Sequence, residues 1–296
     1  MEMVLSAWVL GVIGGSGLYE IDGLHQQRWV KIESPWGRPS DEVLMGEIEG
    51  VPLVFLPRHG RGHPTPPSQI NARANIDVLK RAGCTDLVSF SAVGSLKEEL
   101  APGDFVVVDQ FIDRTFARPK TFFEQGLVAH VSVAHPVCPR LSDMAMAAAR
   151  KGDGRTVQGG TYLAMEGPQF STLAESKLYR SWGCDVIGMT NMPEAKLARE
   201  AELPYASICM VTDYDCWREE TGHVEVTDIL GVMRANAARA RRLLVELALG
   251  MKGERPASPI DTVLDAAVIT DKAAWDPVQV AKLDAVCGRY FKARGV

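Results

Sequence analysis

Residues 205–217 read YASICMVTDYDCW, an apolar run rich in β-branched residues that ends in two closely spaced carboxylates. The run 205–211 predicts a buried β-strand. If the chain stays extended, alternation turns Asp213 and Asp215 toward the same side. Ligands of open α/β sheets bind where the strands end. We therefore expect a sheet with a ligand site at this rim.

Strand and helix patterns alternate through the rest of the chain. Further strands are predicted at 8–13, 51–56, 87–90, 105–108 and 186–188, and 42–48 with 51–56 predicts a hairpin across Glu49-Gly50. Helices are predicted at 70–81, after the capping-box sequence Thr172-Leu173-Ala174-Glu175, from Asn191 as N-cap, and from near Thr227. This mixture predicts a three-layer α/β/α fold with a central mixed β-sheet.

Length and composition indicate an ordinary globular protein of 296 residues, with 46% hydrophobic and 23% charged residues. The net charge of −5 and the lack of a long basic block argue against nucleic acid as a partner. We expect residues 1–250 to form one domain. A linker-like stretch, 250–259, opens the segment 251–296, which we expect to pack on the domain or on a neighbouring subunit.

The cysteines and the apolar runs indicate a cytoplasmic protein. The six cysteines form no C-x-x-C pair, which favours reduced thiols. The N-terminal apolar stretch lacks a basic region and a cleavage motif, and no apolar run reaches the length of a membrane span. We therefore expect no membrane partner.

The acid pair suits a neutral group that offers several N–H donors and needs a proton, as an aminopurine does. Four other segments suit an anion: the loop Gly14-Gly15-Ser16-Gly17, the pair Arg58-His59, the stretch from Ser91 to Ser95, and Met189-Thr190. Each also has a structural explanation, such as a tight turn, a surface arginine, a strand exit or a helix cap. Because all of them are predicted at strand ends, together they predict one site.

Three other kinds of site fit the sequence poorly. The glycine loop lacks the third glycine of a dinucleotide fingerprint, since Glu20 stands at that position. His59 and His63 are four residues apart, but Gly60, Gly62 and Pro64 oppose a helix that would bring them together, so we expect no metal site. We expect no cofactor.

The motifs GVIGGSGLYE, PRHGRGH, SAVGSL, DQFIDRT, MEGPQFST, GMTNMPEA and TDYDCW resemble the trimeric purine-nucleoside phosphorylase superfamily, and within it the methylthioadenosine phosphorylases. The resemblance runs from about residue 9 to residue 249. It implies the α/β phosphorylase fold, assembled as a homotrimer or a dimer of trimers. It also implies reversible phosphorolysis of S-methyl-5′-thioadenosine to adenine and 5-methylthioribose 1-phosphate, with inorganic phosphate as co-substrate, in purine and methionine salvage.

The resemblance also assigns roles to individual residues. Phosphate would be held by Ser16, Arg58, His59, Ser91, Ala92 and Thr190. The nucleoside would be bound by Met189, Phe170, Ser171, Asp213, Tyr214, Asp215, Val226 and Ile229, with His130 contributed to a neighbouring subunit's site. Asp213 and Asp215 would be catalytic, and we expect Asp213 to give the departing purine its proton.

Three alternatives stay open on the sequence. A phosphorylase for 6-oxopurine nucleosides or methylthioinosine would have to place an acceptor against Asp213 and Asp215, which disfavours it. A nucleoside hydrolase would not need the Arg58-His59 pair. A nucleotide-binding regulatory domain would rest on the glycine loop alone.

Overall fold

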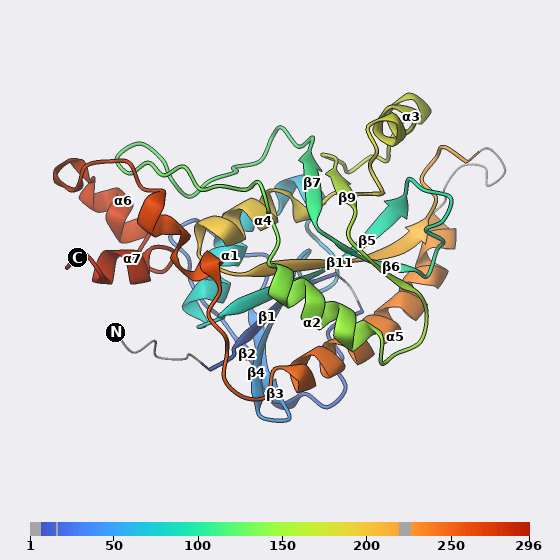
Figure 1. Ribbon diagram of the computed structural model, residues 1–296, viewed down its shortest axis with the longest axis horizontal. Helices are drawn as coiled ribbons and strands as arrows, with labels where there is room; N and C mark the ends of the chain where they lie inside the picture. Colours follow the sequence, from blue (N-terminus) through green and yellow to red (C-terminus); the bar gives the residue numbers. More distant parts are fainter. Residues whose placement is uncertain (1–6, 16, 219–225) are drawn as a thin grey trace.

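The centre of the molecule is an 11-stranded mixed β-sheet (Figure 1). The computed structural model describes residues 7–15, 17–218 and 226–296, with the side chains of 226–229 left out. The strands are β1 (Leu10–Gly14), β2 (His25–Val30), β3 (Val43–Ile48), β4 (Val51–Pro57), β5 (Asp86–Ser95), β6 (Phe105–Val108), β7 (Gln110–Asp113), β8 (Thr156–Gln158), β9 (Thr161–Ala164), β10 (Val186–Gly188) and β11 (Tyr205–Asp213).

The long strand β5 organises the sheet. The main path runs β2-β3-β4-β1-β5-β10-β9-β7, while β11 pairs with β5 and β6, and β8 pairs with β6. Strand β1 is parallel to β4 and β5, and β11 is parallel to β5. The carboxyl ends of these four strands therefore meet at one edge of the sheet, where ligands of α/β folds bind.

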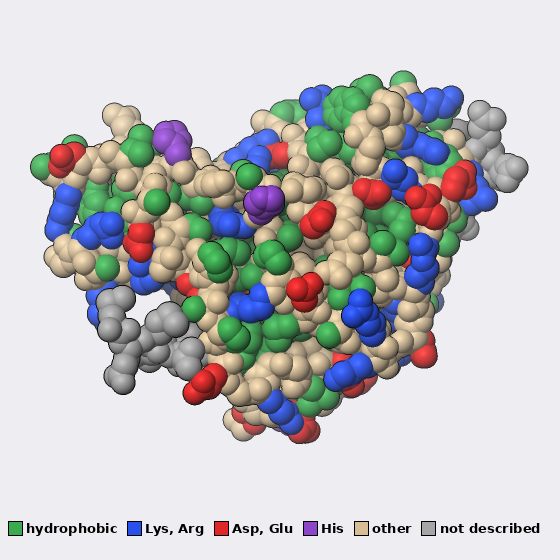
Figure 2. Space-filling model, in the orientation of Figure 1, with side chains coloured by type: hydrophobic (Ala, Val, Ile, Leu, Met, Phe, Trp, Pro, Cys, Tyr) green, Lys and Arg blue, Asp and Glu red, His purple; other side chains and the backbone are tan. Residues whose placement is uncertain are grey.

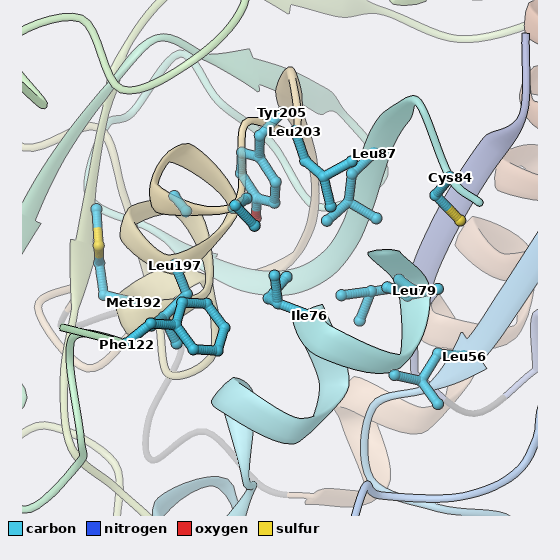
Figure 3. Packing of buried hydrophobic residues seen from close by; sticks show 14 of the residues in the cluster. Leu56, Ile76, Leu79, Cys84, Leu87, Phe122, Met192, Leu197, Leu203 and Tyr205 are labelled. Atoms are coloured by element: carbon cyan, nitrogen blue, oxygen red, sulfur yellow. The ribbon is translucent and has the colours of Figure 1, made fainter. Parts of the chain in front are cut away.

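Helices cover both faces of the sheet, which confirms the predicted three-layer α/β/α architecture. Helices α2 (Pro139–Ala149) and α5 (Val226–Gly250) pack on one face, and α1 (Ala72–Arg81) and α4 (Asn191–Glu200) pack on the other. Figure 3 shows the second of these layers, where Ile76 and Leu79 of α1 and Leu197 of α4 pack with Phe122 and Tyr205. Helix α3 (Leu173–Ser181) projects from the edge of the molecule near β9.

The segment 251–296 folds back on the layer of α1 and α4. It contains the short helices η3 (Pro259–Ala266), η4 (Lys272–Ala274), α6 (Pro277–Lys282) and α7 (Gly288–Lys292). One more short helix, η1 (Pro67–Gln69), lies elsewhere in the chain, directly before α1. Leu264, Leu283 and Phe291 enter the same core as α1 and α4. Buried Arg255 bonds Asp86 at the start of β5, which fastens the segment to the sheet.

Local signals in the sequence were reliable where a short-range mechanism sets the geometry. The predicted hairpin forms between β3 and β4, and Glu49 and Gly50 both take positive φ (50° and 82°), as a tight hairpin turn requires. The capping box at Thr172 and Glu175 forms as predicted. Among the described residues, no helix is long and apolar enough to cross a membrane.

Two kinds of prediction failed. Asn191 does not cap α4: Thr190 stands at the N-cap, Met192 is extended (φ −119°, ψ 133°), and the Asn191 side chain instead bonds buried Ser207. The strands β2, β7, β8 and β9 and the helix α2 were not predicted. Strands β7, β8 and β9 have only three or four residues, too few to show a periodicity.

Candidate active site

A gap in the pairing of β5 lies at the edge where the strands end. Strand β1 pairs with β5 only as far as Ser89, and β10 begins to pair with it at Gly94. Between these residues one side of β5 is open. The Phe90 carbonyl points into the gap, where it accepts from Arg58. Because backbone groups alternate sides along a strand, the Ala92 N–H points into the same gap.

Arg58 and Glu194 form the floor of this gap. Arg58 directly follows β4, and both its side chain and that of Glu194 are buried. The guanidinium donates from Nε and Nη2 to the Glu194 carboxylate at 2.9 and 3.1 Å, and from Nη1 to the Phe90 carbonyl at 2.8 Å. Burial alone would lower the pKa of Arg58, but the Glu194 charge raises it overall. The guanidinium therefore stays charged, although its charge is balanced.

His59 follows Arg58 and carries a neutral ring. Its Nδ1 lies 2.9 Å from the Thr65 carbonyl, and its ring stacks on His63 with centroids 4.1 Å apart. Burial, with a smaller contribution from the charge of Arg58, lowers the pKa of His59 to about 4. Since a carbonyl only accepts, Nδ1 carries the proton and Nε2 keeps its lone pair.

Three hydroxyl-bearing residues surround the gap. The Ser91 Oγ lies 3.3 Å from the Thr190 Oγ1 and 3.4 Å from the Tyr162 hydroxyl, which also accepts from the Thr190 backbone N–H at 3.3 Å. The sequence placed Ser91 beyond a strand that ends at residue 90, and this was wrong: β5 continues to Ser95. Tyr162 was missed because it lies on β9, a strand of four residues without a recognisable pattern.

The acid pair lies where β11 ends. The assumption of an extended chain was wrong: the pairing with β5 shifts register between Val211 and Asp213, and Asp215 lies beyond the strand with φ 51°. Two short bonds hold Asp213 instead, from the Thr212 hydroxyl to Oδ2 at 2.6 Å and from the Asp215 N–H to Oδ1 at 2.8 Å.

Burial gives the two carboxyl groups their character. Burial raises the pKa of both Asp213 and Asp215. The negative charge of Asp213 raises the pKa of Asp215 further. The buried Oδ2 of Asp215 has no hydrogen-bond partner within normal distance among the described residues, although the nearby hydroxyls of Ser176 and Ser171 partly offset the rise in the pKa of Asp215. A Cβ at Gly94 would lie 2.9 Å from the Asp213 Oδ1, so a bare backbone on β5 leaves room for the pair. A raised pKa and an unpaired buried acceptor suit a ligand that brings N–H donors.

The remaining aromatic and sulfur side chains form the walls. The Phe170 ring is 52% exposed and is therefore accessible for stacking on a flat ligand. The next residue, Ser171, accepts from the Cys216 thiol through its carbonyl at 3.3 Å. The Met189 side chain packs against Gly167. Tyr214 directs its hydroxyl toward the Glu98 carbonyl, which makes it part of the packing around the acid pair.

A buried arginine that the sequence did not single out connects two of these walls. Arg118 donates to the carbonyls of Glu166, Met189 and Met192, and its Nε lies 2.9 Å from the Glu166 carboxylate. The loop with Phe170 and the loop with Met189 and Thr190 are therefore tied together. The only signal for this role was an arginine in the long loop after the DQFIDRT motif.

For some predicted site residues the structure does not test the assignment. Ser16 lies outside the described residues, as do the side chains of Val226 and Ile229, whose backbone begins α5. His130 is exposed and bonds Ala267 of the C-terminal segment through its backbone. Across the described parts of the chain, no group of three histidine, cysteine or acidic residues could hold a metal ion.

Comparison with known proteins gives a consistent result. A sequence model of the phosphorylase superfamily matches residues 9–248. An S-methyl-5′-thioadenosine phosphorylase of Cereibacter sphaeroides is 60% identical, over 96% of this chain and 99% of its own. Among solved structures, a methylthioadenosine phosphorylase from an Antarctic soil metagenomic library superimposes with a TM-score of 0.90 at 45% identity, over 95% of this chain and 99% of its own. The Schistosoma mansoni methylthioadenosine phosphorylase in complex with adenine gives 0.75 at 39% identity, over 83% and 93%.

Proposed function

Because the chain belongs to the phosphorylase superfamily, we propose that it catalyses the reversible phosphorolysis of S-methyl-5′-thioadenosine to adenine and 5-methylthioribose 1-phosphate. The observation that carries this proposal is the pair of half-buried Asp213 and buried Asp215 beside the gap in β5, in a chain so similar to S-methyl-5′-thioadenosine phosphorylases. The enzyme is a pentosyltransferase that needs two substrates, a nucleoside and inorganic phosphate.

The purine leaves more easily when it receives a proton. Asp213 is our candidate for the general acid, because burial raises its pKa and so keeps its proton closer to neutral pH. The unpaired Oδ2 of Asp215 is suited to accept from the exocyclic amino group of adenine. A 6-oxopurine would place an acceptor there instead, which disfavours the alternative of a 6-oxopurine or methylthioinosine phosphorylase.

Phosphate attacks the sugar from the gap in β5. Its oxygens would accept from the hydroxyls of Ser91 and Thr190 and from the Ala92 N–H, and the neutral Nε2 of His59 can accept from the hydroxyl of monohydrogen phosphate. Arg58 shapes the floor, and its charge is balanced by Glu194. Fixed donors of this kind position the nucleophile and also stabilise the charge that develops in the transition state.

We extend the proposal to assembly and cellular role. A homotrimer or a dimer of trimers would cover apolar side chains that are exposed in one chain, among them Phe116 at 82% and Trp182 at 44%. His130, which is exposed, would then reach a neighbouring subunit's site. Six unpaired cysteines, five of them buried, fit a reducing cytoplasm. The proposed reaction would there serve purine and methionine salvage.

The electrostatics of the surface agree with small-molecule substrates. Figure 2 shows Lys and Arg side chains interspersed with Asp and Glu over the visible face, and the net charge is −5. The face shown offers no continuous basic track for a nucleic-acid backbone.

The direct test is release of adenine from S-methyl-5′-thioadenosine with and without inorganic phosphate. We expect release only with phosphate, and faster turnover of S-methyl-5′-thioadenosine than of methylthioinosine or inosine. Equal release without phosphate would indicate a hydrolase instead, and a preference for inosine would support the 6-oxopurine alternative.

A further inference from the structure

Tyr162 is a fully buried residue whose hydroxyl contacts the site on the side of the protein interior. Its ring packs beside Phe111 with centroids 5.6 Å apart and is 0% exposed. A Cβ at residue 188 would lie 2.1 Å from the hydroxyl, so Gly188 provides the space that the phenol occupies. The hydroxyl is thereby fixed next to Ser91 and Thr190, the two side chains that line the gap in β5.

The direction of each hydrogen bond around this hydroxyl follows from the donor inventory. A backbone N–H only donates, so the Tyr162 oxygen accepts from Thr190 at 3.3 Å. Burial raises the pKa of Tyr162 to about 12, so the phenol keeps its own proton at neutral pH. That proton can be given to the Ser91 Oγ, which lies 3.4 Å away.

The same reasoning continues to the gap. Once Ser91 accepts from Tyr162, its own proton points away from Tyr162, toward the Thr190 Oγ1 at 3.3 Å, the Ala92 carbonyl at 3.4 Å or a ligand. The Thr190 hydroxyl then need not donate to Ser91, and its proton is free to point outward. Without the phenol proton, the hydroxyl donor that remains beside the Ser91 oxygen is that of Thr190, whose proton is then drawn inward.

We propose that Tyr162 is a positioning residue of the phosphate site, which sets the Ser91 and Thr190 hydroxyls as donors before phosphate arrives. The inference rests on the proposed function, because it takes the anion at Ser91 and Thr190 to be phosphate. Donors that are already oriented need no reorganisation when the anion binds, and this makes them more effective than freely turning hydroxyls.

The test is Tyr162→Phe, which keeps the ring and removes only the hydroxyl. Losing an oriented hydrogen bond of about 0.5–1.5 kcal/mol corresponds to a roughly two- to tenfold weaker interaction with phosphate. We therefore expect the KM for phosphate to rise about two- to tenfold, while the KM for S-methyl-5′-thioadenosine changes by less than about twofold. Tyr290→Phe, in the C-terminal segment, is the matched control and leaves both values unchanged.

A second measurement does not depend on catalysis. Inorganic phosphate alone should raise the Tm of the wild-type protein, and Tyr162→Phe should need a correspondingly higher phosphate concentration for the same rise. If Tyr162 acts through Ser91, its substitution should have a smaller effect in a Ser91→Ala background than in the wild type.

The outcomes separate the two proposals. An unchanged phosphate KM and unchanged protection by phosphate in Tyr162→Phe, with an active wild-type enzyme, would overturn the positioning role. Equal rises in both KM values would also overturn it, because they indicate a generally loosened sheet. A wild-type protein without phosphate-dependent adenine release would overturn the proposed function instead, and the protection experiment would still report on Tyr162.

Discussion

The backbone N–H of Asp215 donates to the Oδ1 of Asp213 at 2.8 Å, so the second acid of the pair fixes the first. The left-handed backbone at Asp215 (φ 51°) directs that N–H back toward the end of β11. With Thr212 on Oδ2, each oxygen of Asp213 has a donor that stabilises the ionised form. These donors favour the state that Asp213 reaches after it has given up a proton.

Replacing the proposed general acid separates activity from stability. We expect Asp213→Asn to lower kcat by about a hundredfold or more, equivalent to roughly 2.7 kcal/mol of barrier. Because the folded pKa of Asp213 is raised, its contribution to stability is present at low pH and is lost as pH rises through that pKa. The Asn variant does not ionise there. Thermal unfolding should show its Tm above that of wild type at pH 8, with the difference shrinking toward pH 4; near-wild-type turnover would refute the assignment.

Removing the Thr212 hydroxyl should change how activity depends on pH. This hydroxyl lowers the pKa of Asp213, so Thr212→Val raises that pKa. If the protonated Asp213 is the active form, the fall in kcat/KM at high pH moves to still higher pH in Thr212→Val. The kcat also drops about tenfold, because one hydrogen bond to the forming carboxylate is lost. Thr212→Ser should restore the wild-type pH profile and the wild-type kcat. A pH profile identical to that of wild type would contradict this role.

Breaking the buried ion pair should destabilise the whole protein. Glu194→Gln leaves the Arg58 guanidinium buried without its counter-charge, which costs about 3–5 kcal/mol. Chemical denaturation should show this loss, together with weaker phosphate binding. Glu246→Gln, which removes an exposed pair with Lys151, is the control and should change the free energy of unfolding by no more than about 0.5 kcal/mol.

Loosening the connection between the two site loops should affect substrate binding. Arg118→Met removes the donors that join the carbonyls of Glu166 and Met189. We expect the KM for S-methyl-5′-thioadenosine to rise by about tenfold or more, since misplaced walls cost affinity and rate. Arg155→Met, which removes a half-exposed pair with Asp104, is the control for the loss of an arginine. Unchanged kinetics in Arg118→Met would show that the loops hold their positions without it.

The sequence predicted the parts of the fold that local chemistry decides. The run 205–211 becomes the first seven residues of β11, and Glu49-Gly50 forms the expected turn, because apolar content and turn residues act over short distances. The three-layer class followed from the alternation of such segments. The short strands β7 and β9 were not predictable, since pairing with distant parts of the chain creates them rather than their own pattern.

The candidate site was predicted by residue type more successfully than by geometry. Arg58, Ser91 and Thr190 lie around the gap in β5, whereas His59 is placed only by its bond to the Thr65 carbonyl and its stacking on His63. Their roles remain predictions. Glu194, Arg118 and Tyr162 were not recognised as site residues, because each acts on a partner far along the chain and a single sequence carries no record of such contacts.

The Arg58–Glu194 pair also constrains how the chain acquires activity during folding. Its two residues are 136 positions apart, and the guanidinium is held at the same time by β5. The floor of the site can form only after the segments around β4, β5 and α4 have come together, so a partly folded chain has no site to offer. Recovery of activity during refolding should therefore not precede the packing of β4, β5 and α4 on one another, and catalysis can report on that packing in this protein.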